Sequence, residues 1–147
     1  MVIATASPAW AQEKTDLAPR IGEWAAGPEQ FITIKADGAA LLIEGNATYG
    51  AEDPEKAAIG AINVGDFSVL VPADWIEQGK VSFGVGENGP LRIDDADEYD
   101  CVVNIAQSGQ TLEVSDNYMC GGMNVTFDGT YSRKWALAGT TISVARL

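Results

Sequence analysis

The sequence predicts an all-β protein, a small antiparallel β-barrel or, alternatively, a β-sandwich. Short segments in which apolar and polar residues alternate recur along the chain, and Gly, Asp, Asn or Ser residues separate them. There are about seven to nine such segments at intervals of roughly 8–12 residues, a pattern typical of barrels and sandwiches. Only residues 51–58 have helical character, and Pro54 limits them to about one turn. A chain of 147 residues fits one domain.

The first clear element is a β-hairpin. Residues 31–35 and 40–44 alternate in hydrophobicity, and Asp37-Gly38 between them is a turn signal because glycine adopts a positive φ without steric cost. The second strand is expected to continue beyond Gly45. Residues 46–49 are this continuation, and further strands are expected at residues 67–71 and 80–85.

The last third of the chain carries the clearest alternation. Residues 101–106 and 111–115 predict a second hairpin with its turn at residues 108–110. Residues 124–131 predict one more strand, with one buried and one solvent-exposed face. Its buried face is expected to hold Val125, Phe127, Gly129 and Tyr131.

The chain divides into a terminal segment, a leader, one body and a tail. The motif Ala-Trp-Ala at residues 9–11 matches the small-x-small pattern that precedes a signal-peptidase cut. We therefore interpret residues 1–11 as a signal-peptide remnant and expect export to the periplasm. No later stretch approaches the roughly 20 apolar residues of a membrane-spanning helix. The expected boundaries are 12–20 for a flexible leader, 21–133 for a single domain, and 134–147 for a tail or an extra strand.

Cys101 and Cys120 are the two cysteines of the chain. In an oxidising compartment they predict a disulfide that closes a loop of about 20 residues and stabilises the fold by about 3 kcal/mol. Two free buried thiols are the alternative. A hairpin turn centred near Gly109 places Cys101 opposite residue 117, so Cys120 is expected just beyond the end of the strand.

The composition excludes most catalytic chemistry. The chain has no histidine, which removes Ser-His-Asp and Cys-His catalysis and His-ligated zinc. We therefore expect a protein that is not an enzyme and holds neither a cofactor nor a metal. The net charge of −12 repels nucleic acids and attracts a basic protein. The alternative is that the acidity serves solubility alone.

The densest charge run extends from Asp94 to Asp100 and reads DDADEYD. A calcium-binding loop would need a glycine at its sixth position and a bidentate glutamate at its twelfth, where this chain has Tyr99 and Ile105. The run therefore predicts a solvated turn or an acidic face for a basic partner.

Gly22-Glu23-Trp24 opens the predicted body and Arg133 closes it. A Gly-x-Trp in the first strand and an arginine after the last resemble the closing arrangement of lipocalin-like barrels. The resemblance implies that Trp24 plugs the base of the barrel and that Arg133 covers its ring. Such a cation–π contact contributes about 0.5–2 kcal/mol.

Residues 99–133 read YDCVVNIAQSGQTLEVSDNYMCGGMNVTFDGTYSR. They resemble the C-terminal part of a family of small exported alphaproteobacterial proteins, with the pattern Asp-Asn, Cys-Gly-Gly and Asn-Val-x-Phe-x-Gly-x-Tyr. The resemblance implies a periplasmic inhibitor of lysozyme-type peptidoglycan hydrolases. Two features depart from it. The Ser-Gly-x-x-Tyr loop of small periplasmic lysozyme inhibitors has Leu112 in place of the tyrosine, and residues 134–147 extend past the usual end.

The expected function is that of a periplasmic binding protein that inhibits or regulates a lysozyme-type hydrolase. Lysozymes are generally basic but their catalytic clefts are acidic, so an inhibitor has to fill the cleft with neutral donors. We expect the contact in the loop after Ser115, where Asn117 offers an amide and Tyr118 a phenol. The other expected contact residues are Ser115, Asp116 and, in the hairpin turn, Ser108. The alternative is a calycin-like carrier of a small apolar ligand inside the barrel.

Overall fold

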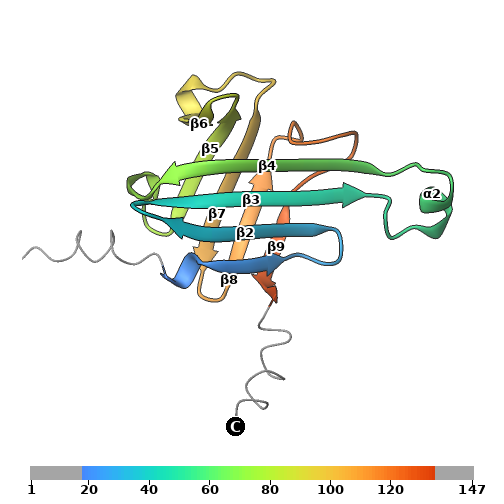
Figure 1. Ribbon diagram of the computed structural model, residues 1–147, viewed down its shortest axis with the longest axis horizontal. Helices are drawn as coiled ribbons and strands as arrows, with labels where there is room; N and C mark the ends of the chain where they lie inside the picture. Colours follow the sequence, from blue (N-terminus) through green and yellow to red (C-terminus); the bar gives the residue numbers. More distant parts are fainter. Residues whose placement is uncertain (1–17, 135–147) are drawn as a thin grey trace, which may run out of the picture.

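The computed structural model describes residues 18–134 (Figure 1). Residues 1–17 and 135–147, which include the expected signal-peptide remnant and nearly all of the expected tail, lie outside the described residues. The described chain forms nine antiparallel strands that close almost completely into one barrel. The predicted barrel is therefore confirmed, and the chain does not adopt the alternative sandwich.

The elements are short and follow the predicted segments closely. The strands are β1 (Gly22–Ala25), β2 (Gln30–Asp37), β3 (Ala40–Tyr49), β4 (Asn63–Pro72), β5 (Lys80–Gly86), β6 (Gly89–Leu91), β7 (Cys101–Ser108), β8 (Thr111–Asp116) and β9 (Gly129–Arg133). The helical elements are the α-helix α2 (Pro54–Ala58) and the 3-10 turns η1 (Ala18–Arg20), η2 (Ala73–Trp75) and η3 (Ile93–Asp95). The shortness of α2 confirms the single helical turn expected near Pro54.

One continuous sheet forms the barrel wall, in the order β4-β3-β2-β1-β9-β8-β7-β5-β6. Both expected hairpins are present. Asp37 pairs with Ala40 across Gly38, and Ser108 pairs with Thr111 across a glycine with a φ of 63°. In Figure 1, β2, β3 and β4 cross in front of β5 and β7 at a steep angle, so the sheet curves round until its two outer strands approach each other.

The barrel has a seam between the outer strands β4 and β6. In residues 18–134 no ladder of backbone hydrogen bonds joins these two strands, although β4 lies beside both β5 and β6. Turn η2 follows β4 and turn η3 follows β6. The guanidinium of Arg92, just before η3, lies 4.2 Å from the ring centroid of Trp75 in η2. This cation–π contact fastens the two sides of the seam.

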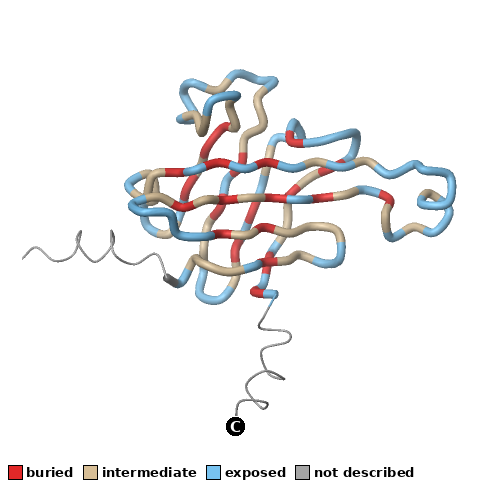
Figure 2. Tube along the Cα trace, viewed as in Figure 1, coloured by how far each residue is buried: buried red, intermediate tan, exposed pale blue. Residues whose placement is uncertain are grey.

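Apolar side chains fill the inside of the barrel. The ring centroid of Phe67 lies 5.9 Å from that of Phe83 and 4.9 Å from that of Phe127. Figure 2 shows the buried positions spread along the strands and the exposed ones gathered in the connections. A cavity lined by Ile34 and Leu112 measures only about 20 Å³, roughly the space of one water molecule. At this place the interior is a packed core.

Trp24 and Arg133 close one end of the barrel, which we call the tryptophan end. The two residues pair across β1 and β9, and Trp24 is fully buried. The guanidinium of Arg133 lies 4.3 Å from the centroid of the indole, as the lipocalin-like pattern implies. Arg133 also donates hydrogen bonds to the carbonyls of Pro19 and Ile21, and the indole N–H of Trp24 donates to the carbonyl of Arg20 at 3.1 Å.

These contacts revise the expected leader. The sequence predicts a flexible segment over residues 12–20, but Ala18–Arg20 form η1. The carbonyl of Pro19 also accepts a hydrogen bond from the side-chain amide of Gln107 at 2.9 Å. Residues 18–20 therefore belong to the closure of the tryptophan end.

We call the opposite end of the barrel the loop end. Its connections are residues 26–29, 50–62, 87–88, 96–100 and 117–128. The segment 117–128 crosses from β8 to the start of β4, where the backbone N–H of Gly122 donates to the carbonyl of Val64 at 3.0 Å. Gly65 allows the crossing, because a Cβ at this position would lie 2.6 Å from the carbonyl oxygen of Cys120.

Residues 124–131 do not form the strand that the sequence predicts; the strand is Gly129–Arg133. The reason is that side chains, rather than a neighbouring strand, bind the backbone ahead of Gly129. The amide of Gln30 donates to the carbonyls of Thr126 and Asp128 at 2.8 and 2.9 Å. The alternation nevertheless identified the buried positions. They are Val125, Phe127 and Tyr131.

The close packing of β3 on the aromatic cluster gives a stability prediction. A Cβ added at Gly45 would lie 2.3 Å from the ring of Phe67 and 2.8 Å from that of Phe127. We expect Gly45→Ala to lower the free energy of unfolding by about 1–3 kcal/mol because the core has to shift. Urea denaturation measures this. The neighbouring exposed residue supplies the control, Asn46→Ala, with an expected change below about 0.5 kcal/mol. Equal stability of the two variants would contradict the packing.

Candidate functional site

The expected contact residues do not form one surface. Ser108 lies in the β7–β8 turn at the tryptophan end, whereas Asn117 and Tyr118 follow β8 at the loop end. Ser108 pairs with Thr111, which begins β8, and Asp116 ends it. At about 3.4 Å per residue this strand separates the two places by roughly 17 Å. We therefore retain the residues after Ser115 in the candidate site and leave Ser108 out of it.

The expected disulfide between Cys101 and Cys120 is confirmed, with a Cα–Cα distance of 4.6 Å. The register differs by one residue from the expectation. Val103 pairs with Asp116, which places Cys101 opposite Tyr118 rather than opposite residue 117. The bond fastens the segment after β8 to the first residue of β7.

Asp116 holds this segment in place. One carboxylate oxygen accepts hydrogen bonds from the backbone N–H of Tyr118 at 3.1 Å and the hydroxyl of Thr126 at 2.8 Å. The other accepts from the backbone N–H of Phe127 at 2.8 Å. The backbone N–H of Asp116 donates to the carboxylate of Asp128 at 2.7 Å. Asp116 thus acts within the fold, and its carboxylate is occupied rather than offered to a partner.

The negative charges of Asp116 and Asp128 act on the phenol of Tyr131, which is buried in the barrel. Burial raises the pKa of Tyr131, and the negative charges of Asp116 and Asp128 raise it further. The phenol therefore stays neutral and donates a hydrogen bond to the carbonyl of Phe127 at 2.8 Å. This bond anchors the segment to β9 from inside the barrel.

Asn117 is also used internally. Its amide nitrogen donates to the carbonyl of Asp100 at 2.7 Å, and its amide oxygen accepts from the backbone N–H of Val102 at 3.0 Å and of Met119 at 3.3 Å. The side chain takes the place of a strand residue beside the start of β7. The amide that the sequence offers as a contact group is therefore occupied by the fold.

Tyr118 is the expected residue that faces outward. Its φ is 61°, in the left-handed region that residues other than glycine seldom adopt, and its side chain is 57% exposed. Its phenol forms no hydrogen bond with another residue of the range 18–134. Such strain persists only where the surroundings impose it, here through Asp116, Asn117 and the disulfide.

Ser115 belongs to a different surface. Its hydroxyl accepts a hydrogen bond from the amide of Asn104 at 3.2 Å, and the amide oxygen of Asn104 accepts from the hydroxyl of Ser82 at 2.7 Å. The three side chains form a polar row across β8, β7 and β5 on the outside of the barrel. The row lies on the outer face of these strands, away from the core, and it is not part of the loop-end connections.

Exposed apolar side chains are concentrated in and beside the loop-end connections, and sequence reasoning missed them. Of ten exposed large apolar side chains in the described residues, eight lie in or beside the loop-end connections. Apart from Tyr118 they are Tyr49, Ile59, Ile62, Val64, Tyr99, Met119 and Met123. Met123 lies next to β4, because its carbonyl accepts a hydrogen bond from the amide of Asn63 at 2.9 Å. No periodic signal marks most of these residues, since they lie in connections; Tyr49 and Val64 are at the ends of β3 and β4.

Charge is divided unequally between the two ends. The loop-end connections carry nine acidic residues and one basic residue, a net charge of −8. The connections of the tryptophan end carry two acidic residues and one basic residue, a net charge of −1. Those connections are residues 18–21, 38–39, 73–79 and 109–110. The acidic run after η3 forms a turn in which Asp97 accepts from the backbone N–H groups of Tyr99 and Asp100 at 2.8 and 3.1 Å.

No protein-family model, curated protein or solved structure matches the chain. Within residues 18–134 no helix is long and apolar enough to cross a membrane. The same range contains no group of three or more acidic or cysteine side chains arranged to hold a metal ion. The candidate site is therefore defined by its own geometry: an outward tyrosine on a braced segment at the loop end, whose connections carry exposed apolar and acidic side chains.

The role of Asp116 can be tested separately from any partner. Asp116→Ala removes the acceptor of three hydrogen bonds, and we expect the free energy of unfolding to fall by about 1–3 kcal/mol. Hydrogen exchange should accelerate most in residues 117–124. Asp66→Ala, which removes an exposed carboxylate from β4, is the matched control and should change stability by less than about 0.5 kcal/mol. Unchanged exchange in Asp116→Ala would contradict the bracing role.

Proposed function

We propose that the protein is an exported binding protein that inhibits or regulates a lysozyme-type peptidoglycan hydrolase through its loop end. The observation that carries the proposal is Tyr118, an exposed tyrosine held at positive φ on a segment braced by a disulfide. Tyrosine is enriched at the energetic centres of protein interfaces, where its ring adds apolar area and its hydroxyl a hydrogen bond.

The bracing supports a role in binding. A backbone already fixed in its bound conformation loses little conformational entropy on association, so more of the contact energy of the side chain it carries appears as affinity. Three independent restraints fix Tyr118: the carboxylate of Asp116, the amide of Asn117 and the disulfide at Cys120. The neighbouring Met119 is 46% exposed and extends the apolar contact.

The charge distribution supports a basic partner that approaches from the loop end. A net charge of −8 in the loop-end connections attracts a cationic protein over a distance of about one Debye length and raises the association rate. Within the acidic cleft of a lysozyme-type enzyme, however, a carboxylate would be repelled. The phenol of Tyr118 is a neutral donor, which suits the cleft, while the acidic residues around it face the basic rim.

The carrier function receives no support from the interior. A small-molecule pocket usually measures about 300–1,000 Å³, whereas the cavity between Ile34 and Leu112 measures about 20 Å³. The rings of Phe67, Phe83 and Phe127 occupy the space that an apolar ligand would need. We therefore retain protein binding as the proposal.

A lysozyme turbidity assay with matched variants tests this proposal. We expect the wild type to inhibit chicken-type or goose-type lysozyme and Tyr118→Ala to weaken inhibition by about tenfold or more. Ser108→Ala should leave inhibition unchanged, because Ser108 lies at the tryptophan end. If neither lysozyme is inhibited and neither binds to the immobilised protein, the proposal fails. If Tyr118→Ala and Ser108→Ala change inhibition equally, Tyr118 does not contact the lysozyme.

The kinetics of association test the electrostatic part. We expect the association rate constant with a basic lysozyme to fall by about tenfold or more from low to physiological salt, because screening weakens steering, while the dissociation rate changes less. Surface plasmon resonance at several salt concentrations gives both constants. Neutralising Glu52 and Glu55 on the 50–62 connection should reduce the salt dependence. A salt-independent association rate would contradict steering by the loop end.

A further inference from the structure

A second hollow surface lies on the outside of the barrel, away from the loop end. It consists of two adjoining grooves of about 430 and 330 Å³, which share Lys80 and Ser82 on β5. The larger groove extends over the seam to Trp75, and the smaller one extends across β7 to Ser115 on β8. Both volumes fall in the range of small-molecule sites. We call the two together the seam groove.

The floor of the seam groove is a fixed row of uncharged polar side chains. Ser82, Asn104 and Ser115 are joined by hydrogen bonds of 2.7 and 3.2 Å and stand on three neighbouring strands. An amide has two N–H donors and two acceptor lone pairs, and these two bonds use one of each on Asn104. One donor and one acceptor of Asn104, and the rotatable hydroxyl proton of Ser115, are not used by these two bonds.

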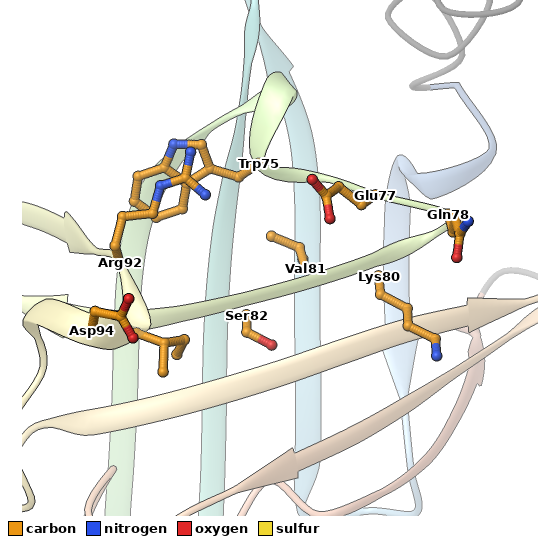
Figure 3. Close-up of a pocket in the computed structure, with 9 residues that line it drawn as sticks. Trp75, Glu77, Gln78, Lys80, Val81, Ser82, Arg92 and Asp94 are labelled. Atoms are coloured by element: carbon orange, nitrogen blue, oxygen red, sulfur yellow. The ribbon is translucent and has the colours of Figure 1, made fainter.

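One wall of the seam groove is aromatic. Trp75 is partly buried against the core, and the guanidinium of Arg92 lies over its ring at 4.2 Å, so the indole has little freedom to move. Figure 3 shows Trp75 and Arg92 stacked on one side, with Glu77, Ser82 and Asp94 around the hollow. Because the guanidinium covers one face of the indole, a ligand in the groove meets the stacked Trp75–Arg92 pair as a rigid wall.

The rim of the groove contains an unusual turn. Gln78 and Gly79 have φ values of 53° and 78° and form the two-residue turn between Glu77 and Lys80. A turn of this kind favours Asn, Asp or Gly at its first central position, so Gln78 is held there at a cost. Its side-chain amide lines the groove and adds another uncharged donor and acceptor.

Charges in the seam groove are mixed, unlike those of the loop end. Glu77 and Asp94 provide acceptors, and Lys80 and Arg92 provide donors, with Glu113 in the smaller groove. Neither Lys80 nor Arg92 forms an ion pair with another residue of the described chain. A cationic or anionic ligand would meet charges of its own sign here, whereas a neutral polyhydroxylated ligand could use every group, because each hydroxyl both donates and accepts.

We infer that the seam groove binds a short neutral oligosaccharide that lies across β5, β7 and β8. Its hydroxyl groups bind to the row of Ser82, Asn104 and Ser115 and to the carboxylates beside it. The apolar face of one sugar ring packs against the stacked Trp75–Arg92 pair. This inference does not rest on the proposed inhibition, since no residue of the seam groove belongs to the braced segment at the loop end.

Titration of the isotope-labelled protein with chitotetraose and with cellotetraose tests the inference by NMR. We expect at least one of these neutral tetrasaccharides to shift the backbone resonances of β5, β7 and β8 with a dissociation constant of about 1 mM or lower, independently of salt. The two arms identify the sugar, because only chitotetraose carries acetamido groups. If neither tetrasaccharide shifts these resonances at millimolar concentration, the inference is overturned.

Variants separate the groove from the rest of the surface. We expect Trp75→Ala to weaken binding by about tenfold and Asn104→Ala by about threefold to tenfold. Trp75 also packs against the core, so a loss of binding in Trp75→Ala can come from loss of folding. Asn104 is exposed, so Asn104→Ala tests binding in the folded protein. Tyr49→Ala, an aromatic outside the groove, should bind as the wild type does. Equal binding by Asn104→Ala and Tyr49→Ala would exclude the seam groove as the site.

Discussion

The carboxylate of Asp116 positions both the inward-facing and the outward-facing side chains of the segment 117–128, which crosses the loop end. It binds the backbone N–H of Phe127, whose ring enters the aromatic core, and the backbone N–H of Tyr118, whose ring faces outward. This segment has no neighbouring strand over most of its length, so its backbone groups need side-chain partners in order to be partly buried without cost. The same acceptor thus seals the barrel and presents the candidate contact residue.

The outer surface of the barrel is chemically divided. The loop end combines apolar side chains with a net charge of −8 in its connections, which suits a basic protein. The seam groove combines an indole, hydroxyls, amides and charges of both signs, which suits a neutral polar ligand. The two surfaces adjoin at the end of β8, where Ser115 ends the polar row and Asp116 begins the restraints on Tyr118.

The sequence predicted those features that depend on local pattern. Alternation identified the strands, the glycines at 38 and 109 identified the hairpin turns, and the number and position of the cysteines predicted the disulfide. The Trp24–Arg133 contact was implied by the resemblance to lipocalin-like barrels. The use of Asn117 within the fold was not predictable, because it depends on how closely the segment after β8 approaches Asp100. The separation of Ser108 from Tyr118 was predictable, since the two ends of one hairpin strand cannot meet.

The seam connects these observations. A fully closed barrel would continue the hydrogen-bonded ladder from β6 to β4, but β6 pairs with β5 only from Gly84 to Gly86, and the rest of that edge faces the groove. The Trp75–Arg92 contact spans the opening with side chains in place of backbone bonds. Because side chains, rather than a further hydrogen-bonded strand, bridge the two edges, a hollow remains between them. The incomplete closure of the sheet therefore creates the seam groove, and the packed core beneath it makes the groove a surface site rather than an entrance.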